Sequence, residues 1–229
     1  MADVQTPIAG LSTCPLQLLL RSYRVHFAMS DSTLLRNPEL LDRQRSHLLV
    51  VDVQEKLVPA IHRRDTIIRR IRFLLDVAQQ LDVPVTVSEQ YPQGLGHTVS
   101  ELATHTAVGA TFDKLRFSAA DRFCEYVGVS PDMAPDAHDG RNQVILVGME
   151  THVCILQTAH NLLSRGFRVY VTEDAVGSGI QHDHEIGIRR LKDAGATICT
   201  AESVAFEWCE TSAADQFKAI SRLVRELRA

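Results

Sequence analysis

Residues 143–165 read QVILVGMETHVCILQTAHNLLSR, and this stretch decides the fold. Its first five residues are almost continuously apolar and β-branched, which is typical of a strand buried on both faces of a parallel sheet. Residues 155–165 then place apolar side chains at helical spacing. The pattern therefore predicts a strand, a sharp turn and a helix, with Cys154 in the first turn of that helix.

Cys154 has two interpretations. The first turn of a helix presents unpaired N–H groups and the positive end of the backbone dipole, which lower the pKa of a thiol and stabilise a neighbouring oxyanion. This placement makes Cys154 a candidate nucleophile. The alternative is a cysteine that packs as a small apolar residue, as most free cysteines do. The local sequence favours neither.

Strand and helix patterns alternate on both sides of this stretch. Strands are predicted at residues 47–53, 84–88, 111–115, 143–147, 167–172 and 196–200. Helices are predicted at residues 65–81, 98–104, 118–126, 155–165, 182–192 and 212–227, and a surface loop at 130–142. This alternation predicts a three-layer α/β fold with a six-stranded parallel sheet. Right-handed crossovers favour the doubly wound, Rossmann-like order 3-2-1-4-5-6, with a cleft between the first and fourth strands.

The composition is that of an ordinary globular chain. Its 229 residues can form one α/β domain with a large core. The net charge of −4 and the absence of a basic stripe argue against a nucleic-acid partner. No run reaches the roughly 18 apolar residues of a membrane span. The five cysteines are scattered without a CxxC pair, so a disulfide framework or a zinc knuckle is not expected. Their pattern instead favours a reducing compartment.

Residues 1–45 differ from the rest, and we expect them to be an N-terminal extension to a domain that spans residues 46–229. The extension has few acids and mixes apolar with basic side chains, as a weak organelle-targeting peptide does. The alternative, which we favour, is a disordered or loosely docked segment. The expected location is therefore the cytoplasm, with the mitochondrion as the alternative if the extension is a targeting peptide.

Two charged residues stand at the ends of predicted strands. Asp52 interrupts an apolar run, where a carboxylate is costly unless it has partners or a task. Its alternative role is to cap a turn. Lys114 ends the third strand, where its ammonium could hold Asp52 ionised and steady a thiolate or oxyanion, although an isolated lysine is more often solvated. The predicted topology brings Asp52 and Cys154 to one crevice, which favours a functional role for both.

Four motifs carry a resemblance to a known family. The runs LLVVDVQEKL, SEQYPQGLGHTVSEL, FDKLRFS and VILVGMETHVCILQTAHNLLSRGFRVYVTEDAVGS look like the isochorismatase-like hydrolase family, in the family's order and spacing. The likeness is closest to the isochorismatase domain-containing proteins. It covers about residues 46–222.

The resemblance implies a cysteine hydrolase with an Asp-Lys-Cys triad, here Asp52, Lys114 and Cys154. It also implies a non-proline cis peptide at Met149–Glu150 and an oxyanion site made by the amides of Cys154 and Glu150. The implied chemistry is attack of Cys154 on a small amide- or imide-like carbonyl, with Asp52 taking the thiol proton. Water then cleaves the thioester.

Two departures from family members narrow the expected substrate. Members that cleave isochorismate lack the cysteine, so Cys154 argues against isochorismate. Nicotinamidases carry an Asp-x-His and a further histidine for a metal, whereas residues 88–97 hold one histidine, so neither a metal nor another cofactor is expected. A dyad of Cys154 with His152 is disfavoured because neighbours in a turn seldom reach each other. His182 and His184 lack the acidic companions of a metal site.

The expected pocket walls, by their position around the triad, are Gln54, Leu57, Tyr91 and Thr151, although the first three fit core or rim equally well. The expected partners are a small-molecule substrate and other copies of the chain, in a dimer or tetramer, with no nucleic acid and no membrane. The alternative to an enzyme is a family member retained as a binding or regulatory scaffold, its triad unused.

Overall fold

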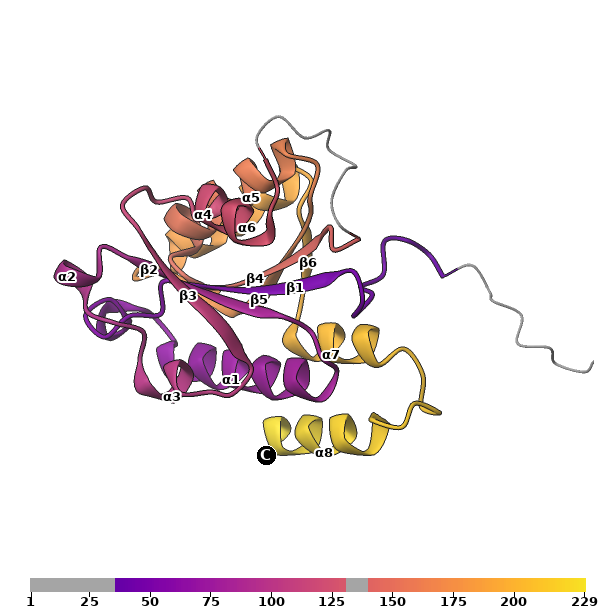
Figure 1. The fold of residues 1–229 in the computed structure, drawn as a ribbon. Coiled ribbons are helices and arrows are strands. Elements are labelled where there is room, and N and C mark those ends of the chain that lie inside the picture. Colours follow the sequence, from indigo (N-terminus) through magenta and orange to yellow (C-terminus); the bar gives the residue numbers. More distant parts are fainter. Residues whose placement is uncertain (1–35, 131–139) are drawn as a thin grey trace, which may run out of the picture. The chain divides into compact units, whose positions relative to one another are not determined.

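The structure, a computed structural model, describes residues 36–130 and 140–229, and Pro38–Ala229 form one compact unit. Its sheet consists of β1 (Ser46–Val51), β2 (Val85–Gln90), β3 (Val108–Lys114), β4 (Gln143–Met149), β5 (Arg168–Gly177) and β6 (Thr197–Cys199). All neighbouring strands pair in parallel, in the order β3-β2-β1-β4-β5-β6 (Figure 1). The predicted doubly wound α/β fold is confirmed.

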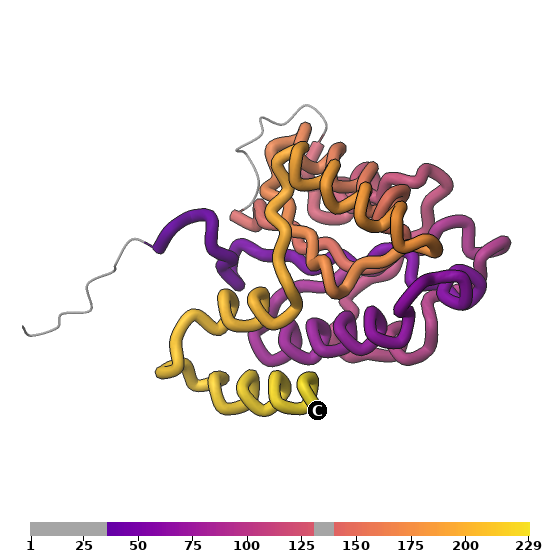
Figure 2. The backbone as a smooth tube through the Cα atoms, turned by 180° about the vertical axis from the view of Figure 1, so that it is seen from behind, coloured from indigo at the N-terminus to yellow at the C-terminus, as the bar shows by residue number. Residues whose placement is uncertain are grey.

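Helices cover both faces of the sheet. On one side of the sheet, α1 (Arg64–Gln80) and α7 (Ala201–Cys209) pack against the strands, and α3 (Ser100–Ala103) and α8 (Phe217–Arg228) pack against these helices. The other side packs against α4 (Ala120–Val127), α5 (Leu156–Ser164) and α6 (Gln181–Asp193). The view from behind shows α1 and the two C-terminal helices on the same side of the sheet (Figure 2). The central strands β1 and β4 are buried along their whole length, which explains their continuous apolar sequences.

Three short helical segments complete the path: η2 (Val58–Ala60), α2 (Pro92–Leu95) and the π-helical turn η3 (Thr151–Ile155). Of the helices within the described ranges, none combines the length and the apolar character that crossing a bilayer demands.

Several element limits differ from the sequence prediction. β5 continues to Gly177 because its second half still pairs with β4 after the β6 pairing has ended at Thr172. The helix α7 was not predicted. It begins at a capping box in which Thr200 and Ser203 exchange hydrogen bonds. The last helix begins at Phe217 rather than at residue 212.

The predicted extension, residues 1–45, lies mostly outside the described residues. In its described part, Leu41 is fully buried in the core cluster that also contains residues of α7 and α8. The backbone N–H of Leu41 also donates to Glu207 at 2.8 Å. Most of the predicted loop at 130–142 likewise lies outside the described residues. The boundary at residue 46 and the cellular location remain predictions.

The carboxyl ends of β1 and β4 lie against each other at Gly148. The register pairs Val51 with Gly148, whose φ is +118°. A β-carbon added at Gly148 would lie 2.0 Å from the carbonyl oxygen of Val51. Only glycine fits this contact, which sets the two strand ends side by side.

We predict that Gly148→Ala lowers the free energy of unfolding by about 3–5 kcal/mol, since the overlap with backbone adds to the unfavourable φ. The matched control is Gly128→Ala, because Gly128 has a φ of +75° but open space where the methyl group would lie. That variant should lose only about 1 kcal/mol. Urea denaturation of both variants measures the difference, and equal losses would contradict the steric argument.

Candidate active site

Asp52 follows β1 and is fully buried. Its φ is +53°, a left-handed conformation that aspartate tolerates better than most residues. Its Oδ1 accepts a hydrogen bond of 2.7 Å from the Ser88 hydroxyl, and its Oδ2 one of 2.7 Å from the ammonium of Lys114. The carboxylate is thus fixed at the carboxyl edge of the sheet.

Lys114 reaches Asp52 from two strands away. It is the last residue of β3, opposite Gln90 on β2, so its side chain must cross β2 to reach the end of β1. Besides the bond to Asp52, its Nζ donates to Gln90 Oε1 at 2.8 Å and to the carbonyl oxygen of Phe117 at 2.9 Å. A lysine has three N–H donors, so all of them are used. Lys114 therefore acts on a neighbouring sulfur through its charge and not through a free donor.

Cys154 lies in η3, directly after β4, and is 6% exposed. Its thiol lies beside the Asp52 carboxylate and near the Lys114 ammonium, so both charges act on it, and the backbone of Glu150 lies next to its sulfur. The turn is closed by the amides of Val153 and Ile155, which both donate to the carbonyl oxygen of Glu150 at 3.1 Å. The structure therefore brings Asp52, Lys114 and Cys154 together.

The protonation states differ from the sequence expectation. The position of Cys154 in the turn suggested a lowered pKa, but burial and the nearby Asp52 charge raise the pKa of its thiol to about 12. Burial also raises the pKa of Asp52, against the opposing effects of Lys114, Cys154 and Ser88. Cys154 is consequently a neutral thiol at rest, beside a carboxylate whose raised pKa makes it a better proton acceptor.

The turn before Cys154 presents its backbone to the same space. The Met149–Glu150 peptide is cis, at the position that the sequence resemblance implied. Met149 is buried in the sheet, and Glu150 Oε1 accepts a hydrogen bond of 3.0 Å from the amide of Gly179. The backbone of Glu150 lies next to the sulfur of Cys154 and acts to lower the pKa of its thiol.

The four expected pocket residues occupy different environments. Gln54 is buried, and its amide bonds to the backbone of Gln90 and Gly96, so it links the end of β2 to the end of α2. Leu57 is half-buried against the core, and Tyr91 is 51% exposed beside the end of β3. Thr151 is fully buried and bonds to His184. Contact of these residues with a substrate remains a prediction.

Sequence reasoning missed two residues of the site. Ser88 holds Asp52, and Gln90 holds Lys114. Both stand on β2, between the strands that supply the two charged groups. Ser88 gave the same signal as Asp52, a polar residue near the carboxyl end of a buried strand.

Two of the histidines near the site have hydrogen-bond partners in the protein. His97 is hydrogen-bonded to Glu89 at 2.9 Å, His152 to the hydroxyl of Ser178 at 2.9 Å, and His182 is exposed. Across residues 36–130 and 140–229, no three or more His, Cys, Asp or Glu side chains are grouped so that they could hold a metal ion.

Comparison with known proteins places this geometry in a family. The model of the isochorismatase domain matches residues 46–203. Isochorismatase domain-containing protein 2 of cattle is 36% identical over 79% of this chain and 83% of its own. A solved structure described as the MAR1 ribonuclease of Caenorhabditis elegans is 36% identical, with a TM-score of 0.73 over 81% of this chain and 92% of that one. The Escherichia coli YcaC gene product, described as an octameric hydrolase of unknown specificity, is 24% identical, with a TM-score of 0.72 over 82% and 93% of the two chains.

We predict that Asp52→Asn speeds alkylation of Cys154 by iodoacetamide at pH 7. The substitution removes the negative charge that raises the pKa of the thiol and leaves the Lys114 ammonium in place. Each unit by which the pKa falls increases the thiolate fraction about tenfold. Peptide mapping by mass spectrometry measures the rate.

Cys199 is the internal control for the alkylation rate. Burial is the main cause that raises the pKa of its thiol to about 12, and Asp52 does not contribute to that shift. Its rate should not change. Slower alkylation of Cys154 in Asp52→Asn would show that the carboxylate does not raise the pKa of this thiol.

Proposed function

The chain belongs to the isochorismatase family of hydrolases, and on that basis we propose that it cleaves a small amide- or imide-like C–N bond through a thioester on Cys154. The observation that carries the proposal is the placement of the buried Cys154 thiol beside the Asp52 carboxylate, which Ser88 and Lys114 hold in position. Such a pair suits proton transfer during attack, because the base already lies next to the thiol whose proton it removes.

In the proposed first half-reaction, Asp52 accepts the thiol proton while the sulfur of Cys154 bonds to the carbonyl carbon. The backbone amides of Glu150 and Cys154 receive the oxyanion. The C–N bond then breaks, and the leaving nitrogen takes the proton from Asp52. In the second half-reaction Asp52 accepts a proton from water, the resulting hydroxide attacks the thioester, and the acid departs as the sulfur regains its proton. Lys114 stays bound to Asp52 throughout and orients it.

We also propose that the chain forms homo-oligomers, as a dimer or tetramer. The support is that the YcaC gene product, which shares the fold, is described as an octamer. Light scattering on the eluate of a sizing column measures the mass, and a monomer at micromolar concentration would oppose the proposal.

A second candidate function comes from the description of the Caenorhabditis elegans relative as a ribonuclease. The net charge of −4 disfavours it, since binding a polyanion usually depends on a basic surface. Incubating the chain with labelled RNA tests this candidate. Cleavage that persists in Cys154→Ala would assign it to a different site.

We predict that Cys154→Ala abolishes ammonia release from a panel of small amides, because the nucleophile is missing. The control is Cys209→Ala, which removes a buried thiol in the other core cluster and should keep the activity. Intact-mass spectrometry of the quenched reaction should detect an acyl adduct on the unmodified protein alone. Equal ammonia release by both variants would refute the covalent mechanism, and no release by the unmodified protein would favour a binding scaffold.

The pH profile of hydrolysis should fall on its acidic side as Asp52 becomes protonated, because a protonated carboxyl cannot accept the thiol proton. Lys114 lowers the pKa of Asp52, so Lys114→Met should move this acidic limb to higher pH. Ser88→Ala removes a weaker lowering effect and should move it in the same direction by less. A limb that stays in place in both variants would exclude Asp52 as the base.

A further inference from the structure

The turn that carries Cys154 is held by one segment of the chain. Three successive residues of the turn each bond to a residue between the end of β5 and the first turn of α6. The pairs are Glu150 Oε1 with the Gly179 amide at 3.0 Å, Thr151 Oγ1 with His184 Nδ1 at 2.9 Å, and His152 Nδ1 with Ser178 Oγ at 2.9 Å. This segment thus contacts the turn on the side away from β1.

The contact between Thr151 and His184 is the buried one of the three. Thr151 is fully buried and His184 is 6% exposed, whereas Glu150 and His152 are half-buried. A hydroxyl buried without a hydrogen-bond partner is strongly unfavourable. The position of Thr151 therefore depends on the imidazole of His184.

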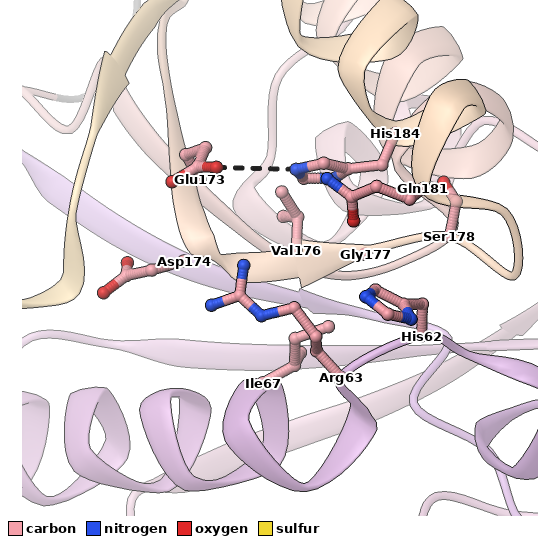
Figure 3. Close-up of a pocket in the computed structure, with 10 residues that line it drawn as sticks. All are labelled: His62, Arg63, Ile67, Glu173, Asp174, Val176, Gly177, Ser178, Gln181 and His184. Atoms are coloured by element: carbon pink, nitrogen blue, oxygen red, sulfur yellow. Dashed lines mark ion pairs between the residues drawn. The ribbon is translucent and has the colours of Figure 1, made fainter.

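The second ring nitrogen of His184 is oriented by β5. Its Nε2 lies 3.5 Å from Oε1 of Glu173, and the two side chains face each other beside a small pocket (Figure 3). The contact with Thr151 forms in both tautomers of the imidazole, because Nδ1 accepts from the hydroxyl when the proton is on Nε2 and donates to it when the proton is on Nδ1.

The helix that supplies His184 lies unusually close to the turn. A β-carbon on Gly187 would lie 3.1 Å from the methyl carbon of Thr151 and 3.2 Å from the backbone of His152. The backbone of α6 therefore packs directly on the turn, and a small shift of the helix would move Thr151. Cys154 follows Thr151 by three residues, about one helical turn.

We propose that His184 is a positioning residue, which acts through Thr151 to hold the turn of Cys154 against Asp52. The proposal rests on the proposed hydrolysis for its kinetic consequences. The reacting groups must keep their mutual geometry within a fraction of an ångström for rapid attack, so loosening the turn should slow the chemical step more than it weakens binding.

Two substitutions distinguish the role of Nδ1 of His184 from that of Nε2. An asparagine amide sits near the place of Nδ1 and can still pair with Thr151, whereas a glutamine amide sits near the place of Nε2 and cannot. His184→Asn should therefore keep kcat within a few fold. His184→Gln should lower kcat roughly ten- to a hundredfold with little change in KM. The control is His182→Gln, on the exposed face of the same helix turn, which should change neither constant.

A double variant tests whether His184 acts through Thr151. Thr151→Val keeps the shape of the side chain but removes the hydroxyl, so adding it to His184→Gln should lower kcat no further. Additive losses would overturn the proposal. So would equal kcat in the Asn and Gln variants, or a loss in KM alone.

Alkylation of Cys154 at pH 7 gives a readout that needs no substrate. Burial is the first cause of the raised pKa of this thiol, so a loosened turn should make His184→Gln react faster with iodoacetamide, while His184→Asn reacts like the unmodified protein. If the unmodified protein cleaves no amide, the proposed function fails, and these rates alone decide the role of His184. Identical alkylation rates in the three proteins would overturn it.

Discussion

The ion pair between Lys114 and Asp52 is the interaction on which the site depends. Both side chains are almost entirely removed from water, and a buried charge is tolerated only when its partners replace the lost hydration. Ser88, Gln90 and the Phe117 carbonyl supply that replacement. Because these groups come from the carboxyl-terminal half of β2 and from the loop after β3, the pair forms only when β1, β2 and β3 are correctly ordered. The ion pair therefore depends on the strand order, and its burial is compatible only with that order.

Much of the fold followed from the sequence because its signals are local. The apolar run of β4 and the lone carboxylate after β1 identified the central strands and the crevice between them. The helix α7 was overlooked although Ala201, Val204, Ala205 and Trp208 have helical spacing and are buried. The short strand before it was expected to lead directly to the last helix. The apolar side of α7 packs against α1 and α8, and that packing cannot be read from a short stretch of sequence.

The protonation of the site was beyond sequence reasoning. The first turn of a helix predicts an acidic thiol, yet burial and the charge of Asp52 raise the pKa of Cys154 against the lowering effects of Lys114 and the Glu150 backbone. Burial depends on packing from several elements, and the distance between Asp52 and Cys154 depends on strand register. Neither is encoded within a short window. The same reason hid the link from Thr151 to His184, which joins residues 33 positions apart.

The contact at Gly148 has a consequence for how this protein can vary. The carbonyl of Val51 occupies the place that any β-carbon would take. Every change in the first two bases of a glycine codon either introduces a side chain or stops translation. Lineages that keep this packing can therefore change that codon only at its third base. Population sequencing should find only synonymous variants at Gly148, whereas codons for nearby surface residues should also carry amino-acid replacements.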